Sequence, residues 1–400
     1  MARVFFIALG LLMLSSLSCE KNDVQEVETI KIGALNSITG NWSSLGKTSK
    51  EAMAIALQEV NSYLENKNSV YRFAGEYYDT KLDVTEAKNA IQTGINSGIR
   101  IFIGPQSSAE VSEISSIANT NNILVVSQGS TASSMAIAND AIFRYCPVDI
   151  MEGAAIGKTM YAAGKQIVIT VARNDAGNIG LQTSVGNTFK ALGGQVDAIT
   201  PYATTLTDYS SLVSTIKAKI QQYSTTVGAS KVAVYAATFD EGKDIFVKAS
   251  SDPVLSTVNW YGGDGIVASS ALLSDAEASG FAVKVGFFAP NFGLPAQAHP
   301  DLSRISSSIF SKTGIEPDAY ALSVYDAVWT IALTVEDNPG VLQDFSKMKT
   351  AFTETSYRFF GITGPTMLDE KGDRKIGTFD YWGIVNENGT YKWKLLGKSS

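Results

Sequence analysis

Two short apolar runs in the first third of the chain each end in a loop of small, hydroxyl-bearing residues. The first run, 101–103, ends in a Gly-Pro pair that precedes Ser107 and Ser108. The second run, 123–126, ends in Ser-Gln-Gly-Ser-Thr at 127–131. Short apolar runs closed by Gly, Pro and Ser are typical of buried strands in a parallel sheet. The two runs therefore predict neighbouring strands of an α/β fold.

Each of these loops lies at the carboxyl end of its predicted strand and before a predicted helix. Ligands of open α/β sheets bind at that edge, and the N–H groups of a helix start favour an anion such as a carboxylate. The first loop would contribute Ser108, and the second would contribute Gly129 and Thr131. In the alternative interpretation, Ser108 and Ser127 only cap helices. Two loops of the same design favour a binding site.

Strand and helix patterns alternate along most of the chain, from the first predicted strand at 30–35 to about residue 288. This rhythm is typical of parallel sheets. The segment 296–352 reads as mostly helical, and the C-terminal part reads as short strands with a hairpin signal at Asn388-Gly389. A chain of 400 residues is too long for one ordinary core, so we expect about two or three domains.

Composition argues against several classes of function. Charged residues make up 18% of the chain and hydrophobic residues 45%, which is typical of a globular protein. The net charge of −7 argues against nucleic acid or an anionic membrane as a partner. The single histidine, His299, leaves almost no basis for a histidine metal site. We therefore expect no metal, no cofactor and no nucleic-acid partner.

The N-terminus has the features of an export signal. Arg3 precedes an apolar run at 4–14 that is too short to span a membrane, and small residues then lead to Cys19. A cysteine in this position resembles the lipobox of bacterial lipoproteins, in which the cysteine is lipidated after export. We predict a signal peptide over 1–19 with lipidation at Cys19, followed by a solvated tether over 20–28. A plain signal peptide without a lipid is the alternative.

The sequence lacks the motifs of common enzyme classes. No dinucleotide fingerprint follows the first predicted strand, and no Walker-type phosphate loop or Gly-x-Ser-x-Gly motif is present. Asp79 and Asp83 read as helix-capping residues more than as an acid/base pair. Cys146 has no nearby histidine and reads as a buried structural residue. We therefore expect a binding protein and not an enzyme.

Polar groups also follow strands predicted further along the chain, at 173–175, 238–241 and 262–264. Hydroxyls and amides from one half of the protein, facing a carboxylate from the other half, would hold a zwitterion. In that arrangement Asp264 accepts hydrogen bonds from the ammonium group. In the alternative interpretation, Asp264 is only a turn residue in its Gly-Gly-Asp-Gly segment.

The order of these motifs resembles a known family, the periplasmic amino-acid-binding proteins of branched-chain amino acid ABC transporters. These are type I solute-binding proteins similar to the leucine/isoleucine/valine-binding protein. The resemblance covers nearly all of residues 29–398 and rests on segments in the expected order. They are IKIGALNSITGNWSSLG, IGPQSSAE, VVSQGST, FRYCPVD, VYAATFDEG, YGGDG, SVYDAV and FFGITGPTMLDEKGDR.

The resemblance implies two Rossmann-like lobes with mostly parallel sheets, joined by three crossovers and closing over the ligand. The crossovers would lie near Pro147, near 288–290 and near Phe359-Phe360. Each lobe is then discontinuous in sequence, with 29–147 and 290–358 in lobe 1 and 148–289 and 359–400 in lobe 2.

The resemblance also implies which residues bind the solute. Ser108 matches the serine whose hydroxyl meets the carboxylate, and Gly129 and Thr131 match the loop that grips both ends of the amino acid. Asp264 stands where the family commonly has an acidic residue for the ammonium group. Apolar residues would line the side-chain pocket, namely Phe239 from lobe 2 and Leu45 or Trp42 from lobe 1.

Three positions depart from the family pattern. Gly177 lies where an aromatic residue is usual, Phe239 replaces a tyrosine, and Asp264 is one methylene shorter than the frequent glutamate. These departures keep the groups that amino-acid binding needs and change the positions that would select leucine.

The expected protein is an extracytoplasmic substrate-binding lipoprotein on the periplasmic or cell-surface side of a membrane. It would capture a small amino acid or related polar solute by hinge closure. It would act as a monomer that delivers the solute to the permease subunits of an ABC transporter. The alternative is a ligand-sensing receptor of the same fold that couples to a signalling partner.

Overall fold

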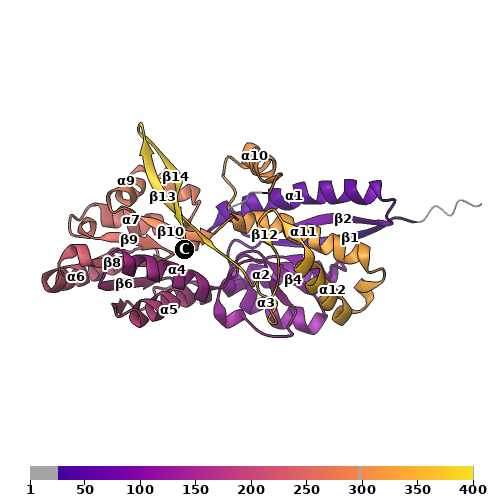
Figure 1. The fold of residues 1–400 in the computed structure, drawn as a ribbon, viewed down its shortest axis with the longest axis horizontal. Helices are drawn as coiled ribbons and strands as arrows, with labels where there is room; N and C mark the ends of the chain where they lie inside the picture. Colours follow the sequence, from indigo (N-terminus) through magenta and orange to yellow (C-terminus); the bar gives the residue numbers. More distant parts are fainter. Residues whose placement is uncertain (1–25, 296–298, 400) are drawn as a thin grey trace, which may run out of the picture.

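The protein consists of two α/β halves that lie side by side along the long axis of the molecule (Figure 1). The computed structural model describes residues 26–295 and 299–399. Both halves contain a sheet covered by helices, so the predicted α/β class with mostly parallel sheets is confirmed. Cys19, the predicted signal peptide and most of the predicted tether lie outside the described residues.

The first half is built on a five-stranded sheet in the order β2-β1-β3-β4-β5, in which every pair is parallel. Both predicted strands with hydroxyl-rich loops, β3 and β4, are present, adjacent and fully buried. The strand bounds are β1 Glu28–Asn36, β2 Tyr71–Asp79, β3 Ile101–Ile103, β4 Leu124–Ser127 and β5 Ile142–Arg144.

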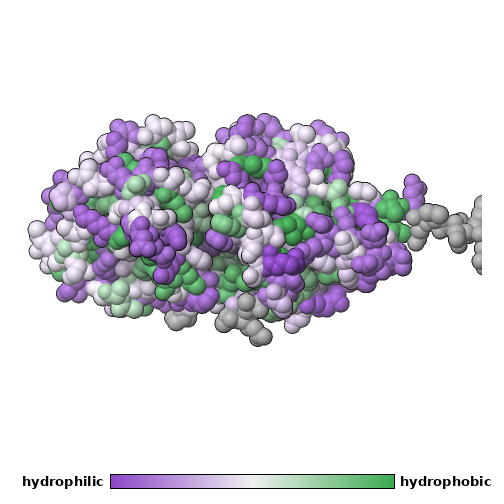
Figure 2. All heavy atoms as spheres, turned by 90° about the horizontal axis from the view of Figure 1, so that it is seen from above, coloured by the Kyte–Doolittle hydropathy of each residue, from purple (hydrophilic) through white to green (hydrophobic). Residues whose placement is uncertain are grey.

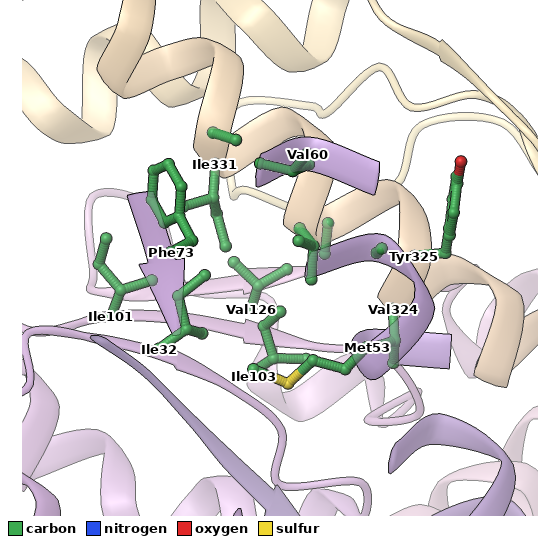
Figure 3. Packing of buried hydrophobic residues seen from close by; sticks show 14 of the residues in the cluster. Ile32, Met53, Val60, Phe73, Ile101, Ile103, Val126, Val324, Tyr325 and Ile331 are labelled. Carbon is green, nitrogen blue, oxygen red and sulfur yellow. The ribbon is translucent and has the colours of Figure 1, made fainter. Parts of the chain in front are cut away.

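Helices cover both faces of this sheet, and the helices of one face come from distant parts of the chain. One face packs against α1, α10, α11 and α12, and the other against α2 and α3. Figure 3 shows the first of these interfaces, in which Val324 and Ile331 of α11 pack with Ile32 and Ile103 of the sheet. The helix bounds are α1 Ser43–Asn66, α2 Val84–Asn96, α3 Ser108–Asn121, α10 Leu302–Thr313, α11 Ala319–Asp337 and α12 Phe345–Arg358.

The second half is built on a seven-stranded sheet in the order β14-β13-β10-β9-β8-β6-β7. Its strands from β10 to β7 are parallel, and β13 and β14 add an antiparallel hairpin. The hairpin turns at Asn388-Gly389 as predicted, and both residues have the positive φ that such a turn requires. The strand bounds are β6 Ile167–Ala172, β7 Gln195–Ala198, β8 Val232–Ala237, β9 Asn259–Gly262, β10 Phe288–Phe292, β13 Phe379–Glu387 and β14 Thr390–Lys398.

Two helix layers cover the second sheet. Helices α4 and α5 lie against one face, and α6 to α9 contribute to the core on the other. In the part of the chain that the structure describes, no helix combines the length and apolarity needed to cross a bilayer. The helix bounds are α4 Asp149–Ala162, α5 Ala176–Ala191, α6 Ser210–Val227, α7 Gly242–Ser250, α8 Ser270–Ser274 and α9 Ala276–Lys284.

Strand and core membership bear on where the expected crossovers lie, and we propose that two of them come later in the chain than the predicted positions. Strand β10 is part of the second sheet up to Phe292, which places the second crossover after that residue. The short strands β11 (Phe360–Gly361) and β12 (Gly364–Pro365) belong with the first half, because Ile362 and Leu368 are buried in its core. We therefore propose that the third crossover follows the 360–374 segment, and that the first lies near Pro147 as expected.

The outline of the molecule is indented where the two halves meet, as Figure 2 shows from above. Contacts nevertheless join the halves across this boundary. The Asn41 side-chain amide donates to Glu241 over 2.7 Å, and the hydroxyls of Ser44 and Ser270 lie 3.0 Å apart. The structure therefore shows the two halves in contact.

Truncation of Ile331 to alanine tests whether α11 is an integral part of the first core. Ile331 is fully buried against strands that precede it by more than 200 residues in the sequence. We expect Ile331→Ala to lower the free energy of unfolding by about 2–5 kcal/mol in denaturant titration, because it leaves a cavity. Tyr357→Ala, on the exposed face of α12, is the control and should change it by less than about 0.5 kcal/mol. Equal effects would contradict the packing described.

Candidate functional site

Loops from both halves converge on a small cavity between them. The cavity holds about 240 Å³ of empty space. Its lining residues are Trp42, Ser107, Ser108, Gly129, Thr131, Gly177, Asn178, Leu181, Phe239 and Asp264. Six of the seven sequence-predicted ligand-binding residues therefore meet at one place, and the seventh, Leu45, does not line the cavity.

Most of these residues lie just beyond the carboxyl end of a parallel strand. Three such loops come from the first sheet, after β1, β3 and β4, and three come from the second sheet, after β6, β8 and β9. The carboxyl ends of parallel strands meet at one edge of a sheet, which is where α/β proteins bind ligands. The edges formed by the carboxyl ends of the parallel strands in both sheets thus face one shared cavity.

Ser108 offers a hydroxyl proton to the cavity. Helix α3 is capped by Ser107, whose side chain accepts from the N–H of Glu110 in a capping box, so the interpretation of Ser108 as the helix cap is wrong. The Ser108 oxygen accepts from the N–H of Ala132 at 3.0 Å and from the hydroxyl of Ser130 at 3.2 Å. With its oxygen already accepting two hydrogen bonds, Ser108 has its own O–H left to donate.

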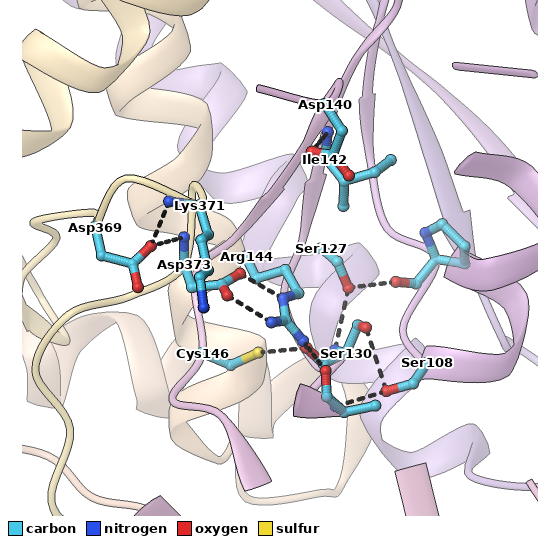
Figure 4. Close-up of polar contacts among 12 residues, drawn as sticks. Ser108, Ser127, Ser130, Asp140, Ile142, Arg144, Cys146, Asp369, Lys371 and Asp373 are labelled. Carbon is cyan, nitrogen blue, oxygen red and sulfur yellow. Dashed lines mark hydrogen bonds and ion pairs between the residues drawn. The ribbon is translucent and has the colours of Figure 1, made fainter. Parts of the chain in front are cut away.

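Arg144 holds the loop that carries Gly129 and Thr131. Its fully buried guanidinium donates to the carbonyls of Ser130 and Ala132 at 2.9 and 2.7 Å (Figure 4). The same group forms a bidentate pair with Asp373, with distances of 2.5 and 2.6 Å. A planar, always charged side chain suits this fourfold contact. The loop is therefore fixed before any ligand arrives.

Ser127 ties this loop to the loop of the neighbouring strand and does not cap a helix. Its hydroxyl donates to the carbonyl of Pro105 at 2.6 Å and accepts from the N–H of Ser130 at 3.1 Å. Gly129 is restricted by space, because a β-carbon there would lie 2.8 Å from the carbonyl oxygen of Gln106 and 3.2 Å from the Trp42 ring. A side chain at 129 would also intrude on the cavity wall.

The first turn of α5 forms the wall opposite Ser108. Asp175 caps this helix by accepting from the N–H of Asn178 at 3.0 Å, and it pairs with Arg173. Both charged side chains of the predicted 173–175 candidate are thus engaged, and the next turn reaches the cavity through Gly177 and Asn178. A β-carbon on Gly177 would lie 3.5 Å from the Ser108 oxygen, in ordinary van der Waals contact, so the start of α5 lies close to the serine. The positive end of the helix dipole faces the same space.

An aromatic pair closes another side of the cavity. The rings of Trp42 and Phe239, one from each half, have centroids 4.6 Å apart at an interplanar angle of 31°. Both side chains are buried, and Leu181 of α5 adds an aliphatic surface. Leu45 belongs to the same buried cluster and packs with the pair. Of the two first-half residues offered by the sequence, Trp42 is therefore the one that faces the cavity.

Asp264 forms the acidic side of the cavity. It begins a short 3₁₀ helix, Asp264–Ile266, and its carboxylate accepts from the hydroxyl of Tyr320 at 2.7 Å. Burial raises the pKa of Asp264 to about 6, and the hydrogen bond from Tyr320 opposes that rise. Asp264 thus lies in a turn, as the alternative interpretation has it, but its side chain is buried and lines the cavity.

The sequence reasoning missed Tyr320 and two further carboxylates, Asp149 and Glu152, which lie in the first turn of α4. The N–H of Asp264 donates to Glu152 at 3.1 Å, and the N–H of Asp149 donates to the carbonyl of Thr131 at 2.8 Å. The only sequence signal was a pair of acids three residues apart after the motif that contains Cys146. That spacing places both acids on one helix face.

The chemistry of the cavity is that of a binding site. Ser108 and the first turn of α5 supply donors on one side, and Asp264 supplies an acceptor on the other. Among the residues described, no group of three or more His, Cys, Asp or Glu side chains is arranged to hold a metal ion. Cys146 is buried, and its thiol donates to the carbonyl of Ser130 at 3.4 Å.

A larger hollow exists at the surface between α10 and the β13–β14 hairpin. It is wide and mainly apolar, with 1110 Å³ of empty space, and Phe310, Trp382 and Trp393 are among its lining residues. None of the sequence-predicted residues lies there. We assign the candidate site to the smaller cavity because fixed donors and acceptors converge on it.

The two-lobed fold with a cavity between the lobes is that of a type I periplasmic binding protein, similar to the leucine/isoleucine/valine-binding proteins. Residues 48–387 match the model of the receptor family ligand-binding region, and the chain belongs to this family.

Relatives and solved structures agree with this assignment. The chain is 30% identical to an uncharacterised protein of Methanocaldococcus jannaschii over 92% of its own length and 89% of the relative's. It is 22% identical to the leucine-, isoleucine-, valine-, threonine- and alanine-binding protein of Pseudomonas aeruginosa, covering 88% and 89% of the two chains.

Two structural neighbours share the fold and differ in the class of ligand named for them. A leucine-binding protein of Thermotoga maritima has a TM-score of 0.73 at 22% identity, over 93% of this chain and 99% of its own. A solute-binding protein of an ABC transporter from R. palustris, in complex with 4-hydroxybenzoate, has a TM-score of 0.75 at 14% identity, over 93% and 97%.

Replacement of Asp373 tests the support of the cavity loop. Asp373→Asn removes the charge that neutralises the buried Arg144, so we expect the free energy of unfolding to fall by about 3–5 kcal/mol. The matched control is Glu76→Gln, which breaks the exposed pair with Lys31 and should cost less than about 1 kcal/mol. Denaturant titrations of both variants provide the comparison. A loss for Asp373→Asn no larger than the control would contradict the role given to Arg144.

Proposed function

We propose that this protein is the extracytoplasmic solute-binding component of an ABC transporter and that it captures a small amino acid or a related amine-bearing carboxylate. One observation carries the proposal. A donor side formed by Ser108 and α5 and an acceptor side formed by Asp264 face the same closed cavity. A zwitterion needs both sides, and an uncharged solute needs neither.

The donor side suits a carboxylate. The Ser108 hydroxyl has its proton free, and the starts of α3 and α5 direct N–H groups and the positive ends of their dipoles toward the same region. Thr131 adds a hydroxyl from the loop that Arg144 fixes. Hydrogen bonds to a charged carboxylate are stronger than neutral ones, so few groups are enough.

The acceptor side suits an ammonium group. Asp264 lines the cavity, and a cation within hydrogen-bond distance would keep its carboxylate ionised despite its burial. Tyr320 holds one of the two carboxylate oxygens, which orients the group before the solute arrives. The resulting ion pair is desolvated by closure, which makes the loss of either partner costly.

The walls between the two sides select the side chain of the solute. Trp42, Phe239 and Leu181 give one apolar surface, and the absence of a side chain at Gly177 gives room near the donor side. The cavity is small in the closed arrangement, which favours a compact solute.

Transport and location follow from the same class of protein. The relatives are solute-binding proteins, which are not enzymes, and we propose that this chain is likewise a non-catalytic, exported monomer. The lipid anchor at Cys19 belongs to the same proposal. The permease subunits of the transporter would be the partners, and a sensing role with a signalling partner is the alternative.

A second ligand class is favoured by a specific observation, the tilted Trp42–Phe239 pair. Such a pair suits a planar ring, and the R. palustris neighbour was solved with 4-hydroxybenzoate. An aromatic acid has no amine, however, and would leave Asp264 without a cation. The buried carboxylate therefore favours the amine-bearing solute.

Calorimetric titration of ligand-stripped protein with pairs of matched solutes tests the role of Asp264. Each pair consists of an amino acid and the same acid without its amine, such as leucine and 4-methylpentanoate. We expect the wild type to prefer the amine and Asp264→Asn to weaken the amine by about 10- to 100-fold, since a hydrogen bond to a charged group contributes about 1.5–3 kcal/mol. The acid should be little affected.

Asp197→Asn is the matched control for that experiment, because Asp197 is a partly buried carboxylate of the second half that pairs with Lys219 and does not line the cavity. It should bind like the wild type. Equal losses for both solutes of a pair in Asp264→Asn would disprove the ammonium role. Binding of none of the solutes by the wild type would count against the proposed function itself.

Ser108→Ala tests the donor side separately. It removes one hydroxyl that would face the carboxylate shared by both solutes of each pair. We expect both affinities to fall by a similar factor, about 10- to 100-fold, in the same titration, because the lost hydrogen bond is to a charged group. A loss confined to the amine would show that Ser108 does not contact the carboxylate.

A further inference from the structure

Three carboxylates gather in one buried cluster beside the cavity, although a single carboxylate would be enough for one ammonium group. Asp149 and Glu152 of α4 and Asp264 are each no more than 5% exposed. Asp264 lines the cavity, and the other two lie directly behind its wall, through backbone contacts with Thr131 and Asp264. The cluster therefore joins the ligand site to α4.

Several polar atoms of this cluster have no hydrogen-bond partner in the structure. They are both carboxylate oxygens of Asp149, one oxygen of Glu152 and the hydroxyl oxygen of Tyr235. The ionised carboxylates can only accept hydrogen bonds, and the Tyr235 hydroxyl has a single proton to donate, so the cluster holds more acceptors than donors. An unpartnered charge at such a depth is costly, and a proton on the carboxyl group removes that cost.

No base within the described chain neutralises the cluster. The nearest guanidinium, Arg144, lowers the pKa of Asp149 through its charge, but it is already engaged by Asp373. Titratable groups face Asp149 and Glu152 from several surrounding elements. They are Asp264 from the 3₁₀ helix, Tyr235 from β8, Tyr320 from α11, Tyr381 from β13, Arg144 from β5, Cys146 after β5 and, further off beside Asp264, Asp318 before α11.

Residues from both halves of the protein bury the carboxylate cluster. Asp149, Glu152, Asp264 and Tyr235 belong to the second half, whereas Thr131 and Tyr320 belong to the first. Opening of the halves would return water to these carboxyls, and closing removes it. Burial is the first cause that raises the pKa of Asp149, to about 8, and it also raises the pKa of Glu152.

We propose that closure of the two halves is coupled to proton uptake by Asp149 and Glu152, so that acidic surroundings favour the closed, solute-retaining state. This inference rests on the proposed capture of a solute by closure and adds a regulation of that site. The solute would contact Asp264, whereas the protons would bind to Asp149 and Glu152, which lie behind it.

The direction of the pH effect follows from the pKa changes. The closed state binds more protons than the open state wherever the pH lies between the ordinary carboxyl value near 3.8 and the raised value of about 8 for Asp149. Lowering the pH through this window therefore shifts the equilibrium between the open and closed states toward the closed state. The open–closed ratio changes by at most about tenfold per pH unit for each proton taken up. Above the raised pKa of Asp149, this stabilisation of the closed state is lost.

Spin-label distance measurements on ligand-free protein test the coupling without any assumption about the solute. Labels at Gln92→Cys in α2 and Gln221→Cys in α6 lie on exposed positions of opposite halves, and pulsed electron resonance gives the closed fraction. We expect the closed-to-open ratio to rise by at least about tenfold from pH 8.5 to pH 5.5. The double variant Asp149→Asn/Glu152→Gln should remain closed and lose most of this response.

The matched control is Glu110→Gln. Burial raises the pKa of Glu110 to about 7, so it titrates in the same window, but it lies in the capping box of α3 within the first half. It should retain the wild-type response. The single variants Asp149→Asn and Glu152→Gln, each expected to lose part of the response, cover the case in which the double variant does not fold.

A wild-type ratio that does not change with pH, or a double variant that keeps the full response, would overturn the inference. The outcome for the proposed function is separate, because it depends on the solute titrations. A pH-dependent closed fraction in a protein that binds none of the tested solutes would leave the proton coupling standing and remove the amino-acid assignment.

Discussion

In a parallel sheet all strands point the same way, and this constraint determines where the functional groups of the protein lie. Each strand must deliver its following loop to the same edge, so a chain that forms two such sheets acquires two edges rich in loop backbone and helix starts. Here the two edges face each other. The cavity therefore receives α3 and the Arg144-supported loop from one half, and α5 and the Asp264 turn from the other.

Burial fixes the polar groups around the cavity in place and also requires them to be hydrogen-bonded. Polar groups taken from water must find partners, and Arg144 illustrates the solution by satisfying Asp373 and two loop carbonyls with one guanidinium. The acidic side of the cavity shows the opposite condition, because Asp149 and Glu152 keep oxygens without partners. A rigid donor side and an under-satisfied acidic side are what a site that holds a cationic group and responds to protons would contain.

Much of the site could be predicted from the sequence because it depends on local patterns. Apolar runs that end in Gly and Ser marked the strand ends, and Ser108, Gly129, Thr131 and Asp264 were found there. Leu45, three residues beyond Trp42 in the first turn of α1, packs in the buried cluster and does not line the cavity.

The remaining features could not be predicted because they depend on contacts between distant segments. Nothing in the local pattern of Phe359-Phe360 shows that the following residues pack in the first core, and the short apolar segment at 288–292 does not reveal which sheet it joins. Likewise, Tyr320 acts on Asp264 only because α11 is brought beside the 3₁₀ helix by the fold.

The central claim is that the cavity orients an amine-bearing acid between Ser108 and Asp264. A crystal structure of the protein with the solute that co-purifies from its host, identified by mass spectrometry, tests it most directly. The account predicts an ammonium nitrogen within hydrogen-bond distance of the Asp264 carboxylate and a carboxylate at the Ser108 hydroxyl and the first turn of α5. A solute without an amine at Asp264, or one bound outside this cavity, would contradict it.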